Sequence, residues 1–283
     1  MQICGRRFSE SEIDWIRNQV ESQPDLNRAR LSRLFCRHAQ WHKPDGGLKD
    51  MSCRVALLRL ERSGLIQLPP AKTTPPPAAG KIKRTRQGEP QSPLELQAGR
   101  VDLDFEPVEP KMSALWNELI DRYHYLGYNR QGGAQMRFFV YASGRLAALL
   151  GFSAAAWRAA PRDQFIGWTD LQRRENLHLV VNNSRFLILP WVSAKNLASR
   201  ILSGAARKLP ELWHRRYNYR PVLLETFVEK QRFAGTCYKA ANWTCVGQTQ
   251  GRGKWDRQYA FAKPVKTIWL YPLERRFREG LCR

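Results

Sequence analysis

The sequence predicts two folded domains, a small helical domain at the N-terminus and a larger α+β or α/β domain with a central mixed sheet. Three observations support this. Residues 8–68 place apolar side chains at helical spacings of three and four. Residues 178–253 alternate short apolar runs with segments of helical period. Between them, seven of the 17 prolines fall within residues 69–100, a composition typical of a linker.

Composition places the chain among folded proteins. It has 283 residues, 43% of them hydrophobic, and ten tryptophans, which is enough for a packed core. There is no apolar run near the ~18 residues that a membrane span needs, and the start has no apolar signal-peptide core. We therefore expect a cytoplasmic protein without a membrane partner. The six cysteines never fall in C-x-x-C spacing, so neither a zinc ribbon nor a redox pair is expected.

Charge is unevenly distributed along the chain. The formal net charge is +22, and residues 191–283 hold 19 Lys and Arg against six Asp and Glu. A protein this basic usually binds a polyanion, and guanidinium groups with aromatic rings suit phosphates and exposed bases. The pattern indicates a DNA partner, duplex or single-stranded, and predicts one basic trough in the last third. The alternative is a surface whose charge only serves solubility.

The N-terminal domain is expected to contain three helices and a strand. Ser9 or Ser11 can cap the first helix and Asn27 the second, because their side-chain oxygens accept the free backbone N–H groups of a first turn. The third helix is expected to end at Gly64. The apolar residues 65–68 then predict a strand.

This order in residues 1–70 resembles a winged helix-turn-helix domain, whose third helix would enter a DNA major groove. Arg54, Arg59 and Arg62 lie on the side of that helix opposite its apolar residues, where they could contact DNA. The alternative is a three-helix module that binds protein.

Residues 71–100 are predicted to be a solvated linker. Proline stiffens such a segment and removes backbone donors, so it spaces two domains. Its cations could also follow a phosphate backbone. They are Lys81, Lys83, Arg84 and Arg86.

The second domain, residues 101–283, alternates strands and helices. Ser143-Gly144 is expected to join two strands as a hairpin, and Pro210 could kink or end the long helix. The expected elements are a strand near 101–108, a helix over 112–123, strands over 136–142 and 146–152, two apolar runs over 179–189, a helix over 195–217, a strand over 221–228, a short helix over 237–242 and one or two strands over 259–271.

This order is similar to that of the GNAT acyltransferase fold. In that family a glycine-rich loop before the long helix holds the coenzyme A pyrophosphate with its backbone donors. The matching residues 191–196 contain no glycine, so we expect no acetyl-CoA. Tyr238 lies where a GNAT enzyme often keeps a general-acid tyrosine, and beside Cys237 it could also be a nucleophile. The alternative is a packed tyrosine whose hydroxyl is hydrogen-bonded.

At finer grain, residues 101–270 resemble the DruA family, the short component of Druantia-type anti-phage defence systems. The matching segments read GYNRQGGAQMRFFV, RDQFIGW, NNSRFLILPWV, NLASRIL, LLETFVE, GTCYKAANW and GRGK. Relatives also travel with transposase-like genes in mobile elements. The resemblance implies a partner in DNA biology and a place beside other defence or mobile-element proteins, but it brings no catalytic residues.

Glu225 and Asp163 are the candidate catalytic and metal-binding acids. Glu225 lies in an apolar strand within a basic neighbourhood, and Asp163 lies in the segment RDQFIGW. Brought together, they could hold Mg²⁺ for phosphodiester cleavage or strand transfer. The alternative is that each pairs with an arginine such as Arg162 or Arg185.

Several residues of this domain are expected to contact nucleic acid. Cations suit phosphates, and amides or an indole at element ends suit base edges and stacking, although capping explains asparagine equally well. The residues are Arg185, Lys195, Arg200, Arg232, Lys239, Asn242, Trp243, Arg252 and Lys254.

Together these features predict a DNA-binding protein of a phage-defence system or mobile element that recognises or processes DNA. If it is an enzyme, a metal-dependent nuclease or transposase-like recombinase is expected. The alternatives are an acyl-group transferase with an altered donor site and a scaffold whose basic face docks an acidic protein.

Overall fold

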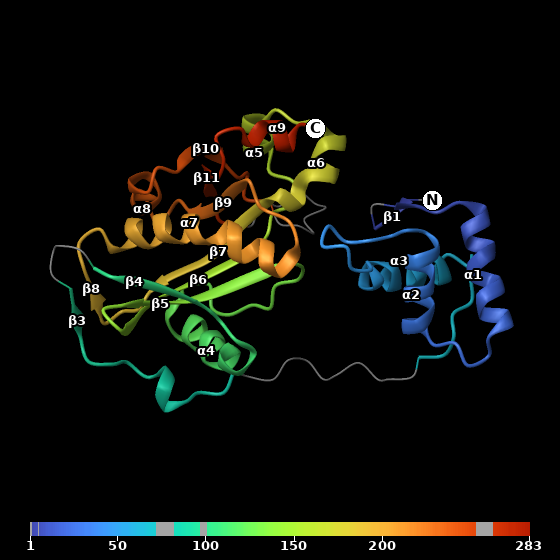
Figure 1. The fold of residues 1–283 in the computed structure, drawn as a ribbon, viewed down its shortest axis with the longest axis horizontal. Helices are drawn as coiled ribbons and strands as arrows, with labels where there is room; N and C mark the ends of the chain where they lie inside the picture. The colour runs from blue at the N-terminus through green and yellow to red at the C-terminus, as the bar shows by residue number, and fades with distance from the viewer. Residues whose placement is uncertain (1, 5, 72–81, 97–100, 253–262) are drawn as a thin grey trace. The chain divides into compact units, whose positions relative to one another are not determined.

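The computed structural model describes residues 2–4, 6–71, 82–96, 101–252 and 263–283. The chain divides into two compact units, Met1–Gly80 and Lys81–Arg283 (Figure 1). Two expected nucleic-acid contacts, Lys81 and Lys254, lie outside the described residues.

Three helices and a short hairpin form the N-terminal unit. They are β1 (Gln2–Ile3), β2 (Arg6–Arg7), α1 (Glu10–Ser22), α2 (Arg28–His38) and α3 (Asp50–Arg62). The predicted caps are confirmed, since Ser9 forms a capping box with Glu12 and Asn27 accepts the Arg30 N–H. The helices bury a core of their own around Phe35.

The strand predicted over residues 65–68 is wrong. Ile66 and Leu68 are buried in alternation, but the chain there is irregular and the Leu68 N–H donates to Glu61 Oε1. The alternation of buried and exposed side chains is the pattern of a strand, but among the described residues no other strand pairs with this segment. These residues therefore form no wing, and a DNA-reading role for α3 stays a prediction.

A seven-stranded mixed sheet forms the centre of the C-terminal unit. Its strands are β4 (Leu103–Pro107), β5 (Gln135–Ala142), β6 (Arg145–Ala154), β7 (Val180–Ile188), β9 (Leu223–Glu229), β10 (Thr244–Gln248) and β11 (Lys266–Pro272). They lie in the order β10-β11-β9-β7-β6-β5-β4, and every pairing is antiparallel except that of β7 with β9. The predicted hairpin is confirmed, with Ser143 and Gly144 at positive φ in its turn.

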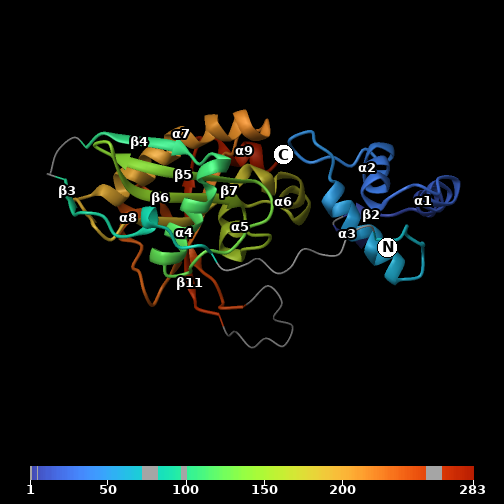
Figure 2. The same cartoon turned by 90° about the horizontal axis from the view of Figure 1, so that it is seen from below.

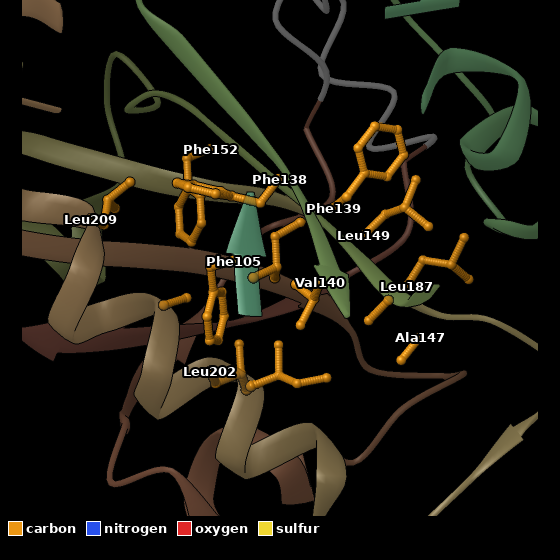
Figure 3. Packing of buried hydrophobic residues seen from close by; sticks show 14 of the residues in the cluster. Phe105, Phe138, Phe139, Val140, Ala147, Leu149, Phe152, Leu187, Leu202 and Leu209 are labelled. Carbon is orange, nitrogen blue, oxygen red and sulfur yellow. The ribbon is translucent and has the colours of Figure 1, made fainter. Parts of the chain in front are cut away.

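Helices cover both faces of this sheet (Figure 2). They are α4 (Ser113–Tyr123), α5 (Ala160–Ile166), α6 (Asp170–Asn176), α7 (Leu197–Tyr217), α8 (Thr236–Ala240) and α9 (Phe277–Leu281). On one face Phe105 of β4 packs against α7, where Gly204 leaves room for its ring and Leu202 lies nearby (Figure 3). On the other face Trp116 of α4 packs over Gly151 of β6. This order of elements is the one expected of a GNAT-like domain, so the fold class of the second domain is confirmed.

Residues 82–96 pack on the C-terminal unit, which differs from the linker predicted over 71–100. Thr85 donates its N–H and its hydroxyl to Glu118 of α4 over 2.7 and 2.8 Å. Farther on, β3 (Leu94–Glu95) pairs in parallel with β8 (Val192–Ser193). Proline content could not show this, because the segment is held by a buried carboxylate that lies elsewhere in the sequence.

Two features of the helices bear on the predictions. α7 continues through Pro210, so that proline does not end it. Within the described ranges, no helix is both long and apolar enough to cross a membrane.

Candidate functional site

The divergence of β7 and β9 opens a cleft in the C-terminal unit. The two strands pair over three residues only, ending at Asn182 and Glu225, after which β7 stays with β6 and β9 with β11. Cavities of about 670 and 590 Å³ lie side by side at this opening. Both have Leu126, Asn183, Ser184 and Phe227 in their walls.

Asn183 holds together the point where the strands part. Its Oδ1 accepts the Tyr238 hydroxyl over 2.9 Å, its carbonyl accepts the Thr226 hydroxyl over 3.0 Å, and its Nδ2 donates to the Gly151 carbonyl. Burial raises the pKa of Tyr238, so this hydroxyl stays protonated. The structure thus gives Tyr238 a packed, hydrogen-bonded position at the floor of the larger cavity, the alternative to a catalytic role.

Glu225 and Asp163 lie close together because both form ion pairs with Arg162. Arg162 Nη1 lies 2.9 Å from Glu225 Oε2 and Arg162 Nη2 lies 2.7 Å from Asp163 Oδ1. The Ala156 N–H donates to Glu225 Oε1, and Asp163 also accepts from Trp168 Nε1. Burial raises the pKa of Glu225, and the Arg162 charge opposes that rise.

This network corrects the predicted metal site. All four carboxylate oxygens of Glu225 and Asp163 accept hydrogen bonds from protein donors, as expected of acids that neutralise an arginine. Among the residues that the structure describes, no group of three or more His, Cys, Asp or Glu could hold a metal ion. Arg162 is fully buried, and both carboxylates lie against its guanidinium as counter-charges.

Aromatic side chains line the larger cavity, here called the aromatic cavity. Tyr125, just after α4, lies 5.3 Å from Phe233 of the β9–α8 loop, measured between ring centroids. The Arg232 guanidinium lies 4.8 Å from the Tyr125 ring centre. Phe186 of β7 and Phe227 of β9 line the same cavity. Phe233 is 48% exposed, so the cavity offers apolar surface to solvent.

Four cations line the smaller cavity, here called the cationic cavity. They are Arg185, Arg252, Lys263 and Lys266, with Glu229 as the acid beside them. Burial lowers the pKa of Arg185 and of Lys266, as expected for cations crowded away from water. Asn182 contributes a buried Oδ1 that has no hydrogen-bond partner in the described chain.

His124 lies beside both cavities. Its Nδ1 accepts the Leu126 N–H over 3.2 Å, which places the proton of the neutral ring on Nε2. Burial, followed by the charges of Arg185 and Lys266, lowers the pKa of His124 to about 4. The cleft therefore disfavours the imidazolium form of His124, first through burial and then through its cations.

The other predicted contacts in this unit do not join the cleft. Arg200 belongs to a separate cavity over α7, and Lys195 and Lys239 are exposed outside both walls of the cleft. Asn242 adopts a left-handed conformation after α8. The prediction that Trp243 offers a stacking surface is wrong, because the residue is 4% exposed and its ring packs on Tyr238 and Tyr271.

The prediction of one basic trough is also wrong. Arg207, Lys208, Arg215 and Arg216 project from α7, which covers the sheet face opposite α4, whereas another group lines the cationic cavity. Sequence position could not show this, because a helix and a loop of equal charge can lie on opposite faces.

Of the cations predicted outside the sheet, Arg84 pairs with Asp121, and Lys83 and Arg86 are exposed. On α3, Arg54 pairs with Asp50, whereas Arg59 and Arg62 are exposed.

Sequence reasoning found Arg185, Arg232 and Arg252 but missed several residues of the cleft. The aromatic run Tyr123-His124-Tyr125, directly after a predicted helix, was a readable signal. Lys263 and Lys266 flank the closing strand and carried no pattern of their own. The missed residues are His124, Tyr125, Phe233, Lys263 and Lys266.

The fold and the cleft together define a GNAT-like α/β protein with a cationic opening between its central strands. Within that class the chain belongs to the DruA family, since the family model described as "Druantia protein DruA" matches residues 60–280. No curated protein matches the chain.

Solved structures similar to this chain include a GNAT-family acetyltransferase from Streptococcus pneumoniae, at 12% identity and a TM-score of 0.40 over 61% of this chain and 100% of that one. YncA, a putative acetyltransferase from Salmonella typhimurium with its cofactor acetyl-CoA, matches at 13% and 0.39 over 61% and 95%. Aminoglycoside acetyltransferase AAC(6')-Ib in complex with coenzyme A matches at 12% and 0.39 over 63% and 98%.

Proposed function

We propose that this DruA-family protein binds DNA in the cleft between β7 and β9, as part of an anti-phage defence system or a related mobile element. One observation carries the proposal: the cavity lined by four cations lies next to the aromatic cavity, and the two share wall residues. Cations neutralise phosphates, and aromatic faces stack on bases of any sequence. Nucleic acid is a polymer that presents phosphates and flat aromatic groups side by side.

The cationic cavity supplies the phosphate contacts in this proposal. Arg185 and Lys266 lie half-buried at its base, whereas Arg252 and Lys263 are exposed at its rim. A phosphate there would relieve the crowding that lowers the pKa of both half-buried cations. The net charge of the four cations and Glu229 favours a polyanion over a neutral ligand.

The N-terminal unit is a second candidate DNA contact. Arg59 and Arg62 are exposed on α3, and Met51 and Val55 are exposed on the same helix at 64% and 43%. Cations with apolar side chains suit phosphates and thymine methyl groups of a major groove. This supports the predicted reader role of α3.

An acyl-group transferase is the less favoured function. Residues 191–196, which would have to hold a pyrophosphate, contain no glycine, and β3 pairs along this segment. The Leu94 and Leu96 N–H groups donate to the carbonyls of Trp191 and Ser193. Neighbouring chain thus covers the segment at which an acyl carrier would be bound.

Matched double substitutions test the DNA proposal on the full chain. R252Q/K263Q removes two rim charges of the cationic cavity, and R207Q/K208Q removes two exposed charges from α7. The measurement is affinity for a labelled oligonucleotide over a salt series, in duplex and single-stranded form. Removing two phosphate contacts should reduce the slope of log affinity against log salt by ~1.8 for duplex or ~1.4 for a single strand.

We expect the larger loss in the cleft variant. Equal losses in both variants would contradict binding in the cleft and leave only a diffuse charge effect. Absence of any salt-dependent binding by the unsubstituted protein, with thermal stabilisation by an acyl-coenzyme A, would favour the transferase instead.

A further inference from the structure

We infer that the aromatic cavity seats one unstacked nucleobase, so that the preferred ligand is DNA with unpaired nucleotides rather than intact duplex. This rests on the proposed function, because it assigns a role to the second half of the same cleft. Phosphate contacts alone would be indifferent to whether the bases are present.

The walls of the aromatic cavity come from three separate parts of the chain. Tyr125 follows α4, Phe186 lies on β7, and Phe233 lies between β9 and α8. Tyr125 and Phe233 pack on each other at 5.3 Å between ring centroids and so form one aromatic surface, on which a base can stack as it does in sites for single-stranded nucleic acid. The volume of about 670 Å³ lies within the ~300–1,000 Å³ of small-molecule pockets. This volume is ample for one base with its sugar.

Exposure separates this cavity from ordinary core packing. Phe233 is 48% exposed and Leu126 is 37% exposed, and both line the 670 Å³ cavity. Trp157, at 60%, directly follows Ala156, a wall residue of the cationic cavity. Within the described part of the chain, three of the six exposed large hydrophobic side chains therefore lie at or next to this cleft.

Polar groups in the aromatic cavity fit a base edge. His124 keeps its proton on Nε2, which makes that atom a donor, whereas the Tyr238 hydroxyl is bonded to Asn183 Oδ1 and lies 3.5 Å from the Thr226 hydroxyl. His124 is uncharged at neutral pH, since its pKa lies far below 7. The Arg232 guanidinium lines the same cavity, so His124 and Arg232 both offer donors to the carbonyl oxygens and ring nitrogens of a base.

The positions of the two cavities also indicate where the phosphate and the base of one nucleotide would lie. The cationic cavity and the aromatic cavity share Asn183 and Ser184 in their walls, so a phosphate in one is adjacent to a group in the other. A base can reach the aromatic cavity only if it has left the duplex stack, which costs least where it is already unpaired. This predicts tighter binding to single strands, mismatches or gaps than to intact duplex.

Abasic DNA provides the direct test. The ligands are a thymidine 12-mer and the same 12-mer abasic throughout, which have equal phosphate charge, and each is titrated against the full-length protein. We expect the abasic strand to bind roughly 5- to 150-fold more weakly, the range for one or more lost stacking contacts. F233A should weaken binding of the thymidine strand by a similar factor while leaving the abasic strand unchanged.

Two variants serve as controls. F233W keeps an aromatic face and should retain preference for the base-bearing strand. L171A removes an apolar side chain that is 63% exposed on α6, away from the cleft, and should change neither affinity.

The outcomes separate this inference from the proposed function. Equal affinity of both strands, together with loss of both in R252Q/K263Q, would overturn base seating while leaving DNA binding in the cleft intact. If neither strand binds, the proposed function itself fails. Equal weakening of both strands by F233A would assign Phe233 to the fold rather than to a base, and would also overturn the inference.

Discussion

Arg162 donates from Nη1 to Glu225 Oε2 over 2.9 Å, in an ion pair whose two side chains are both 0% exposed. Asp163 binds the same guanidinium from the other side. Arg162 also donates to the Ala156 carbonyl, and the Ala156 N–H donates back to Glu225. The pair thereby fixes the chain just after β6 at Ala156, which forms part of the wall of the cationic cavity.

Replacing Glu225 by alanine should destabilise the protein by roughly 3–5 kcal/mol, because a buried arginine loses one of its counter-charges. Urea unfolding of the full chain measures this. E211A is the matched control, since Glu211 pairs with Arg215 and Arg220 at the surface, and it should leave stability unchanged within error. A stable E225A protein that loses only a Mg²⁺-dependent activity would restore the metal hypothesis.

His124 should make DNA binding stronger as the pH falls. In the free protein its pKa is about 4, because burial and the charges of Arg185 and Lys266 oppose the imidazolium. A bound phosphate neutralises those charges and raises the pKa, so between about pH 6.5 and 4 binding takes up a proton. Affinity should then rise by up to about tenfold per unit of pKa increase.

Stability of the free protein should change in the opposite direction over that window. The unfolded chain protonates His124 near pH 6.5 and the folded chain only near pH 4, so its contribution falls as the pH is lowered between them. H124Q should flatten both profiles. A proton uptake on binding that survives in H124Q would show that another group titrates.

Segment 82–96 should come loose when Gly88 is replaced by alanine. An added Cβ would overlap the Glu118 carboxylate, which is 1% exposed and holds Thr85. Limited trypsin digestion should then cleave faster after Arg84 and Arg86. G132A is the control, because a Cβ there would meet nothing within 4 Å. Unchanged cleavage in G88A would mean that Glu118 does not hold the segment.

Packing between α7 and the edge strand β4 can be tested at Gly204. A Cβ at this position would lie 2.6 Å from the Phe105 ring, so G204A should cost about 1–3 kcal/mol despite the higher helix propensity of alanine. G280A in α9, where the nearest atom would be Val222 Cγ1 at 4.0 Å, should be neutral or stabilising. Thermal unfolding of both variants gives the comparison. A G204A protein as stable as G280A would show that the ring moves freely.

The sequence determined the elements of this protein because their signals are local. The Ser9 and Asn27 caps, the Ser143-Gly144 turn and the apolar period of α7 each depend on a few neighbouring residues. The segments that resemble the DruA family also include Asn183, Arg185 and Glu225, so the sequence alone drew attention to these three residues. Residues 65–68 failed because burial alone can produce a strand-like alternation.

Tertiary structure decided which side chains act together. Glu225 and Asp163 became partners of Arg162 rather than metal ligands, since α5, which holds Arg162 and Asp163, meets Glu225 of β9 only in the assembled domain. The cations of α7 and those that line the cationic cavity form separate groups. The cleft itself exists because two strands stop pairing after Asn182, and no local pattern records where a ladder between distant strands ends.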